Sequence, residues 1–568
     1  MAFDAEITTS RPGAALLVLA AFALAAAASA VAGLLFRLVR RTAPGRLVFG
    51  ERTRGVTFAC AAAALFYGGF YLNAGVLPGK THPLSLGADA ALLVLFWLAV
   101  RFVPRLRIRG RFLYALLVLL VAAAGGTAAA FAGSSRRLAP PETAPPPRAA
   151  NLLVITMDTT RADRLGAYGG PPGLTPNVDA LAASGRAYPR AYCAMPLTGP
   201  SHASLFTGRA PREIGVVRNG MRLVAESPTM AEVLRSRGYR TGAVVAAFTV
   251  SSKLGFDRGF EYFDDAFSAA DALTRLTAAR VAEAVGVVAA KAGLQRPGDE
   301  VTPRAIRWLQ DEGNRPFFLW VHYFDPHTPY EPPARYRRLT SPADPRIGLY
   351  DGEVAFMDAE IGKLLAALED AGVRDETVVV AVADHGESLG EHDYYYDHGR
   401  DVYEPCMRVP LVVAAPHGFP GMGVEYVMDA APNGGTDLVA MRSLYAFLLE
   451  GLAAYPPQNP PARNEIVPLA SDAVLGESLD EGFNYRMIAT REDGVLYKLV
   501  LDAASGRVEL YDLDADPNEL ENVAGTKAEV VRVLRPRLED YFDGQPALSA
   551  GGPTDAETKK KLRSLGYM

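Results

Sequence analysis

The sequence predicts an α/β protein that is preceded by a bundle of about four transmembrane helices. Three observations support this fold class. Four apolar stretches of membrane-spanning length fall within residues 1–138. From residue 151 onward, short β-branched runs alternate with segments whose apolar residues have helical spacing. Near the C-terminus, two runs of alternating apolar residues predict a smaller antiparallel sheet. The 568 residues exceed one domain of about 100–200 residues, so several structural units are expected.

The apolar stretches predict spans at about 12–36, 55–78, 84–100 and 112–133. The first has 25 residues without a charge, more than the roughly 20 that cross a hydrocarbon core. A cleaved signal peptide is the competing interpretation, but only Arg11 precedes this long stretch as a positive charge, and further apolar stretches follow. Asp89 interrupts the stretch at 84–100, which is retained because a consistent topology requires it.

Arginine placement predicts the orientation of this bundle. The first and third loops between the spans hold eleven arginines, whereas the second loop holds only Lys80. Under the positive-inside rule the arginine-rich loops are cytoplasmic, so the N-terminus and the residues after the fourth span lie outside the cytoplasm. Proline cannot continue a helix, so residues 139–150 form a Pro-rich linker. We expect a multi-pass protein of a bacterial plasma (inner) membrane, because short Ala- and Arg-rich loops suit that setting.

Charge differs between the two parts of the chain. Residues 1–150 carry sixteen Lys and Arg against five Asp and Glu, whereas the other 418 residues carry 42 against 58. An acidic domain has no general attraction for a phosphate backbone, so nucleic acid is not an expected partner. Three cysteines exclude a disulfide scaffold, and Cys193 and Cys406 are the only pair that the main domain could bridge.

Three short apolar runs in the second part are typical of buried strands that end in polar residues. They are NLLVITMDTT (151–160), PFFLWVHYFDPH (316–327) and TVVVAVADHGE (377–387). Residues 353–371 show the spacing of an amphipathic helix. Strands that alternate with helices predict a sheet covered on both faces, with a site at the strand ends.

The polar residues at these strand ends predict a metal site. Chain order suggests that Asp158, Asp384 and His385 converge at one edge of the sheet. A hard divalent cation takes carboxylate oxygens, and a histidine ligand shifts the preference toward zinc, manganese or iron. An ordinary loop start would equally explain a single Asp–His pair after a strand.

The segment AMPLTGPSHASLFTGR (194–209) offers hydroxyl groups that such a metal could activate. A free hydroxyl attacks a phosphate or sulfate ester poorly at neutral pH, whereas a metal-bound, deprotonated hydroxyl is a competent nucleophile. Thr198 precedes a Gly-Pro turn that could hold it at a helix start, where backbone N–H groups favour an anion.

Five motifs in residues 150–568 resemble, in the same order, those of the sulfatases of the alkaline-phosphatase superfamily. They are the opening strand with Asp158, residues 198–202 with 207–209, residues 322–327, residues 384–387, and residues 493–524 with the ending 565–567. The resemblance implies an alkaline-phosphatase-like sheet sandwiched by helices at 151–470. A C-terminal subdomain at 471–568 would have strands at 493–502 and 507–513, and a helix near 525–542.

The resemblance also implies roles for individual residues. Metal ligation is implied for Asp158, Thr198, Asp384 and His385, with one or two divalent ions (Ca, Mn or Zn), and Thr198 is the implied nucleophile. The implied substrate-binding residues are His202, His327 and His398. A second metal site could include Asp325, His322 and His392, although a role in loop structure explains these three residues equally well.

Several residues depart from the sulfatase pattern. Thr198 stands where sulfatases carry the cysteine that becomes formylglycine, and threonine cannot undergo that oxidation. His202 replaces the motif's arginine, and Thr159 replaces the second residue of an Asp-Asp pair. Cys193 lacks the proline and arginine at the required offsets, and no Lys-Trp-His segment occurs near 244–250. These changes resemble the branch that uses a Thr or Ser alkoxide on a transition metal, which includes phosphodiesterases and membrane-anchored phosphoglycerol and phosphoethanolamine transferases.

The expected function is therefore metal-dependent hydrolysis of sulfate or phosphate esters by a membrane-anchored enzyme with a Thr198 nucleophile. The expected partners are the lipid bilayer and a sulfated or phosphorylated glycan, lipid or small-molecule ester. One alternative is an envelope transferase that moves a phosphoryl-containing headgroup from lipid to glycan. Another is a non-catalytic envelope protein with a sulfatase-like fold.

Overall fold

The structure is a computed structural model. It describes residues 136–137, 149–267 except 225–226, 294–310, 315–337, 344–419, 438–454, 470–479, 483–546 and 558. The chain divides into two units, residues 1–134 with 269–292 and residues 135–268 with 293–568, and the described residues belong to the second. The predicted transmembrane spans lie outside the described residues and stay a prediction. Within the described ranges, no helix combines the length and the apolar character that a membrane crossing requires.

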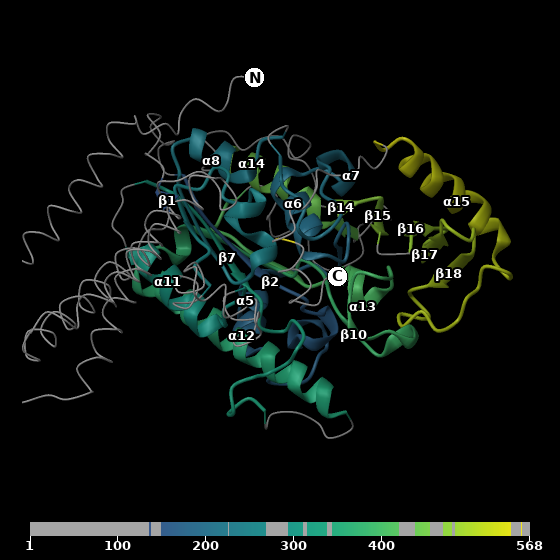
Figure 1. The fold of residues 1–568 in the computed structure, drawn as a ribbon, viewed down its shortest axis with the longest axis horizontal. Coiled ribbons are helices and arrows are strands. Elements are labelled where there is room, and N and C mark those ends of the chain that lie inside the picture. Colours follow the sequence, from purple (N-terminus) through teal and green to yellow (C-terminus); the bar gives the residue numbers. More distant parts are fainter. Residues whose placement is uncertain are drawn as a thin grey trace, which may run out of the picture. The chain divides into compact units, whose positions relative to one another are not determined.

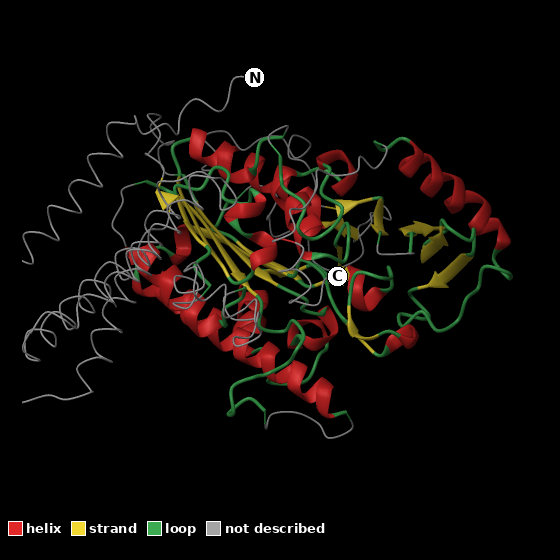
Figure 2. Cartoon of the chain, in the orientation of Figure 1, coloured by secondary structure: helices red, strands yellow, loops and turns green. Residues whose placement is uncertain are grey.

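The second unit is built around an eight-stranded sheet. In sheet order its strands are β1 (Arg136–Arg137), β6 (Tyr262–Asp264), β5 (Arg240–Val245), β7 (Phe317–Tyr323), β2 (Asn151–Met157), β8 (Thr377–Val382), β12 (Leu411–Ala414) and β3 (Arg186–Ala187). The strands from β6 to β8 run parallel. The others pair antiparallel with their neighbours. Helices lie on both sides of this sheet, which confirms the predicted α/β class (Figures 1 and 2).

The three predicted buried strands correspond to β2, β7 and β8, which lie next to one another with β2 in the middle. Every residue of these strands is buried. Burial on both faces explains why their sequences are nearly continuous apolar runs. The parallel pairing brings their carboxyl ends to one edge, where the N–H of Asp158 donates to the carbonyl of Tyr323 at 3.0 Å.

The longer helices pack against the sheet and against one another. They are α5 (Pro176–Ser184), α6 (Thr198–Thr207), α8 (Met230–Ser236), α11 (Gly298–Gln310), α12 (Pro345–Asp370) and α14 (Leu444–Ala454), and the short helices are α7 (Pro211–Ile214) and α13 (Glu404–Met407). The predicted helix at 353–371 corresponds to the last 18 of the 26 residues of α12. This helix begins earlier because Asp344 caps it by accepting the N–H of Arg346 and because Pro345 suits the first helical position.

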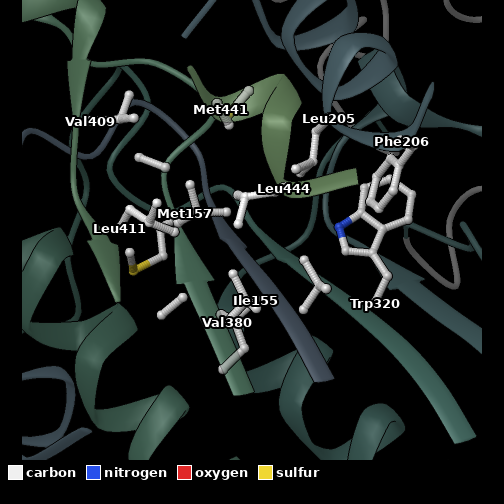
Figure 3. Close-up of a cluster of buried hydrophobic side chains, with 14 of the residues drawn as sticks. Ile155, Met157, Leu205, Phe206, Trp320, Val380, Val409, Leu411, Met441 and Leu444 are labelled. Carbon is white, nitrogen blue, oxygen red and sulfur yellow. The ribbon is translucent and has the colours of Figure 1, made fainter. Parts of the chain in front are cut away.

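The main hydrophobic core joins α6 to the sheet through Trp320 on β7. The indole ring packs edge-on against Phe206 of α6, with ring centroids 4.6 Å apart. Its Nε1–H donates to Thr156 Oγ1 on β2 at 2.9 Å, so its polar atom is satisfied inside the core. Figure 3 shows this ring beside Leu205 and Phe206, with Ile155 on the neighbouring strand. This packing holds α6 against the strands of the sheet.

A second, four-stranded antiparallel sheet lies toward the C-terminus. Its strands are β15 (Ala473–Ser478), β16 (Tyr485–Glu492), β17 (Val495–Asp502) and β18 (Val508–Asp512), and α15 (Ala528–Asp543) packs on it. The predicted smaller antiparallel sheet is thus confirmed. Asp493 and Gly494 both have positive φ, as a tight hairpin between β16 and β17 requires.

Two further small sheets complete the described part of the unit. One contains β11 (Arg408–Val409), β4 (Arg190–Tyr192), β13 (Leu438–Ala440) and β14 (Ala470–Ser471), and the other contains β9 (Ser388–Leu389) and β10 (Tyr395–Asp397). Cys193 and Cys406, the one pair that could have formed a disulfide, are both free and buried.

Candidate active site

Three side chains that could ligate a metal ion lie close together at the ends of β2 and β8. Asp158 follows β2, and Asp384 and His385 follow β8, the neighbouring parallel strand. One potential ligand atom from each residue lies within 4.8 Å of the others, and all three residues are buried. Across the described ranges, they form the only group of three acidic, histidine or cysteine residues with this geometry. The structure therefore brings together the three residues whose convergence the sequence predicted.

Thr198 is the first residue of α6 and lies beside this group. Its Oγ1 is 3.4 Å from Nε2 of His385. The preceding residue, Leu197, is extended, and the N–H of Gly199 donates to Oδ1 of Asn219 at 2.7 Å. A Cβ at Gly199 would lie 3.1 Å from that oxygen, so a larger residue would crowd the contact that holds this turn. Ser201 Oγ instead donates to the backbone carbonyl of Asp384 at 2.6 Å.

The two carboxylates of the group have more oxygen atoms than the surrounding residues supply with hydrogen bonds. Backbone N–H groups of Thr159 and His385 donate to Oδ1 of Asp384 at 3.3 and 2.8 Å. Among the described residues, Oδ1 of Asp158 and Oδ2 of Asp384 have no hydrogen-bond partner although both are buried. Burial raises the pKa of Asp158, and the nearby charges of Asp384 and Glu387 raise it further. A divalent cation would satisfy these oxygens, so the residues present fit a metal ion.

His385 is oriented to contribute one ring nitrogen to this group. Its Nδ1 lies 2.9 Å from the carbonyl oxygen of Gly386, which only an N–H can contact favourably. The lone pair of the neutral ring is then on Nε2, which faces Thr198. A histidine held through one nitrogen by a carbonyl is the usual arrangement of a metal-ligating imidazole.

Two further histidines lie behind the carboxylates. His202, one turn after Thr198 on α6, places Nδ1 2.8 Å from the Thr198 carbonyl and 3.5 Å from Oδ2 of Asp384. His322 on β7 places Nε2 3.2 Å from Oδ2 of Asp158 and accepts the N–H of Ala246 at Nδ1. Burial lowers the pKa of both imidazoles. His202 thus contacts the first turn of α6 and His322 contacts Asp158, while substrate binding by His202 stays a prediction.

His327 and His398 lie on the other side of His385. The His398 ring centroid is 4.4 Å from that of His385 and 5.0 Å from that of His327. The His327 ring stacks on Phe324, and its Nδ1 lies 2.7 Å from the carbonyl of Thr328. Burial lowers the pKa of both histidines. The structure thus gathers these two substrate-binding candidates around His385, while their roles stay a prediction.

The residues considered for a second metal site do not assemble. Asp325 accepts the N–H of Gly298 at the start of α11, at 2.8 Å. His392 stacks on Tyr403 with ring centroids 3.7 Å apart. His322 contacts Asp158 of the first group instead. The structure favours the loop-structuring interpretation for Asp325 and His392.

The sequence assigns no role to Glu387, which contacts His398, or to Asn219, which accepts the N–H of Gly199 in the first turn of α6. Glu387 directly follows the Asp-His-Gly motif, and a charged residue at this place after a buried strand is the signal that could have indicated a site role. Asn219 lies in a loop twenty residues after Gly199 and carries no signal in the sequence.

The fold and the site together define an α/β protein with a candidate metal-binding ester-hydrolase centre at the ends of its parallel strands. A family model described as Sulfatase matches residues 150–440, and the chain belongs to the sulfatase family. Family membership makes it an enzyme that hydrolyses sulfuric esters.

Relatives of this chain are recorded as sulfatases. An uncharacterized sulfatase YidJ of Escherichia coli (strain K12) is 26% identical over 454 residues, which cover 69% of this chain and 87% of that protein. A choline-sulfatase of Rhizobium meliloti (strain 1021) is 24% identical over 445 residues, covering 66% and 82%.

Solved structures share the fold. A putative sulfatase yidJ from Bacteroides fragilis matches with a TM-score of 0.52 and 20% identity, covering 71% of this chain and 97% of that chain. A phosphonate monoester hydrolase of Agrobacterium radiobacter matches with a TM-score of 0.53 and 21% identity, covering 69% and 95%.

Proposed function

We propose that this enzyme cleaves sulfate or phosphate esters through Thr198, with a divalent ion held by Asp158, Thr198, Asp384 and His385. The observation that carries the proposal is the 3.4 Å approach of Thr198 Oγ1 to His385 Nε2, beside two buried carboxylates with unpartnered oxygens. A bound divalent ion would lower the pKa of a coordinated hydroxyl and stabilise charge on the ester oxygens.

The residues of the chain support a two-step displacement. Oγ1 of Thr198 loses its proton and attacks the sulfur or phosphorus, so that a bond from Oγ1 to that atom forms while the bond to the leaving alcohol breaks and the alcohol oxygen takes up a proton. Water then attacks the same atom and the bond to Oγ1 breaks. Oγ1 takes up one proton of that water, which restores the Thr198 hydroxyl, and sulfate or phosphate is released. His202 holds the carbonyl of Thr198 in place, and His327 and His398 contact the nonbridging oxygens.

The names of the relatives support a sulfate ester as substrate. Relatives include a choline-sulfatase and an N-acetylgalactosamine-6-sulfatase, which favours a sulfated small molecule or saccharide here too. The resemblance in fold to a phosphonate monoester hydrolase keeps phosphoryl and phosphonate esters among the substrates to be tested.

The proposal includes a membrane anchor and an extracytoplasmic catalytic domain. Four apolar stretches within residues 1–138 and the eleven arginines of two intervening loops support it. A substrate of this enzyme would then be an ester of the cell envelope or of the medium outside it.

The test is a measurement of metal content and substrate range on the full-length protein in detergent. Metal analysis should find at least one divalent ion per chain. The substrates are 4-nitrophenyl sulfate, 4-nitrophenyl phosphate, bis(4-nitrophenyl) phosphate and 4-nitrophenyl phenylphosphonate, with choline sulfate and a 6-sulfated N-acetylgalactosamine as non-aryl substrates. Turnover of at least one class by the metal-loaded protein is expected. A protein that binds no divalent ion, or that is fully active without one, would contradict the proposed chemistry.

A further inference from the structure

Glu387 is a fully buried carboxylate that contacts His398, one of the histidines gathered around His385. It follows His385 by two residues, and its Oε1 lies 3.3 Å from Nδ1 of His398. Its Oε2 accepts the hydroxyl of Tyr330, and its backbone carbonyl accepts a guanidinium N–H of Arg161 at 3.2 Å. Both carboxylate oxygens and the backbone oxygen of Glu387 are therefore engaged.

Tyr330 is itself held in place. Its ring packs edge-on against Tyr350, with centroids 5.4 Å apart. The hydroxyl of Tyr350 donates to the carbonyl of Thr159 at 2.8 Å and accepts the N–H of Arg161 at 2.9 Å. Thr159 follows the metal-ligand candidate Asp158 directly. Through Tyr350, the tyrosine end of the Tyr330–Glu387–His398 chain thus contacts the backbone segment that follows Asp158.

The position of Glu387 fixes which ring nitrogen of His398 lies on the side away from this carboxylate. An imidazole has two ring nitrogens, and a carboxylate on one of them fixes both the ring orientation and the function of the other. Because Nδ1 of His398 faces Glu387, Nε2 lies on the opposite edge, and the ring stands 4.4 Å from His385. Without the carboxylate, the ring could rotate about its side-chain bonds and present either nitrogen.

We propose that Glu387 is a positioning residue that holds His398 so that its Nε2 edge meets the substrate, and that Tyr330 in turn holds Glu387. The inference rests on the proposed function, because the contact between His398 and the ester is part of that proposal. A buried carboxylate is costly to desolvate, so a purely structural position would be filled as well by an apolar side chain.

A double-mutant cycle tests whether Glu387 acts through His398. The variants are Glu387→Gln, His398→Gln and the double variant, made in the full-length protein. They are assayed for kcat and KM on whichever 4-nitrophenyl ester the wild type turns over. Glu387→Gln should lower kcat/KM by about 10–100-fold, the usual cost of losing a residue that orients a site histidine. In the His398→Gln background the same change should cost less than about twofold, since the orienting contact no longer has a target.

Two further variants act as controls. Tyr330→Phe keeps the carboxylate but removes its hydroxyl partner, so it should lower kcat/KM in the same direction by a smaller factor. Glu353→Gln changes a buried carboxylate on α12 that accepts the N–H of Glu331 at 2.7 Å, outside the site, and should keep the activity of the wild type. Thermal unfolding of each variant reports whether it is folded.

The outcomes separate this inference from the proposed function. Full activity of Glu387→Gln, or an equal loss in both backgrounds, would overturn the positioning role even if Thr198→Ala is inactive. Full activity of Thr198→Ala would instead overturn the proposed nucleophile. If Glu387→Gln fails to fold, Tyr330→Phe is measured with and without His398→Gln, and equal losses in the two backgrounds would overturn the inference.

Discussion

Oγ1 of Thr198 lies 3.4 Å from Nε2 of His385, although the two residues are 187 positions apart in the chain. Two features of the fold create this approach. The aromatic core around Trp320 fixes α6 against the sheet, and the pairing of β2 with β8 places His385 beside Asp158. The hydroxyl at the start of α6 therefore faces a group of metal-ligating atoms, and its removal tests the central step of the proposed function.

Thr198→Ala should abolish turnover, by about a thousand-fold or more, because the attacking oxygen is lost. Thr198→Ser should keep part of the activity because the oxygen survives. Folding should be unaffected, since one small side chain is changed at a helix start. Steady-state kinetics and thermal unfolding of the three proteins check these outcomes.

The matched control for this series is Ser201→Ala on the same helix. Ser201 Oγ donates to the buried carbonyl of Asp384, so its loss should lower the free energy of unfolding by about 1–3 kcal/mol and leave most activity. Loss of turnover in Ser201→Ala, with full activity in Thr198→Ala, would move the nucleophile to Ser201.

Removal of the divalent ion should abolish activity and leave two buried carboxylates unsatisfied. Treatment with a chelator is expected to lower both turnover and thermal stability, because only the folded state has the assembled ligands. Addition of Ca²⁺, Mn²⁺ or Zn²⁺ in turn should restore activity with at least one of them.

Elemental analysis of Asp384→Asn should show reduced metal content, whereas Asp514→Asn, a change at a half-exposed surface carboxylate, should bind the ion normally. Equal metal content in both variants would remove Asp384 from the ligand set.

Asp264 is predicted to stabilise the fold at neutral pH through Arg296. The two side chains are paired at 2.8 Å, and that of Arg296 is fully buried. Burial by itself would raise the pKa of Asp264, but Arg296 and Arg304 outweigh it and hold the pKa below its ordinary value of 3.8. A carboxyl group with a depressed folded pKa stabilises the protein above its unfolded pKa, and this contribution is lost as the pH falls through the folded pKa.

Asp264→Asn should therefore lower the free energy of unfolding by about 3–5 kcal/mol at pH 7, since it leaves a buried guanidinium without its counter-charge. The difference from the wild type should shrink as the pH falls below 3.8. Urea unfolding at a series of pH values measures both effects. A difference that stays constant down to acid pH would show that lost packing, not lost charge, is the cause.

Reporter fusions after residues 45, 80, 108 and 150 should alternate between the cytoplasmic and the extracytoplasmic side, beginning in the cytoplasm. The reason is the eleven arginines of the first and third loops against the single Lys80 of the second. An alkaline phosphatase and a fluorescent protein, active on opposite sides of the membrane, report each position independently. A cytoplasmic signal at 150 would place the catalytic domain inside the cell and contradict an extracytoplasmic substrate.

The parts of the site that lie at strand ends could be predicted from the sequence. Parallel strands deliver their carboxyl ends to one edge, so Asp158, Asp384 and His385 meet there. The strands of the C-terminal sheet could also be predicted, because apolar residues alternate with a period of two in a half-exposed sheet.

The contacts made by loops could not be predicted in the same way. Glu387 and His398 are joined through the β9–β10 hairpin, whose side-chain directions follow no period. The sequence allows His322 as a ligand of a second ion, but its position on β7 next to β2 directs it toward Asp158. The direction of the His322 side chain depends on which strands are neighbours in the sheet, and the order of strands along the chain does not reveal this.

The last prediction concerns Lys498, a fully buried lysine on β17. Its Nζ pairs with Oε1 of Glu404 and with Oε1 of Glu519, both at 2.9 Å. Glu404 begins α13, whose Cys406 carbonyl accepts the N–H of Gly386 beside His385 at 2.9 Å. The ammonium group therefore links the C-terminal sheet to the segment that follows the metal-ligand candidates. Lys498→Met keeps most of the side-chain volume but leaves the buried carboxylate of Glu519 and the partly buried carboxylate of Glu404 without their shared counter-charge, so it should lower the free energy of unfolding by about 3–5 kcal/mol. Replacing Glu404 and Glu519 by Gln in the same chain should recover part of that loss, because the repulsion disappears. Urea unfolding of the three proteins measures the effect, and an unchanged stability of Lys498→Met would show that this ion network does not hold the C-terminal sheet to the catalytic part.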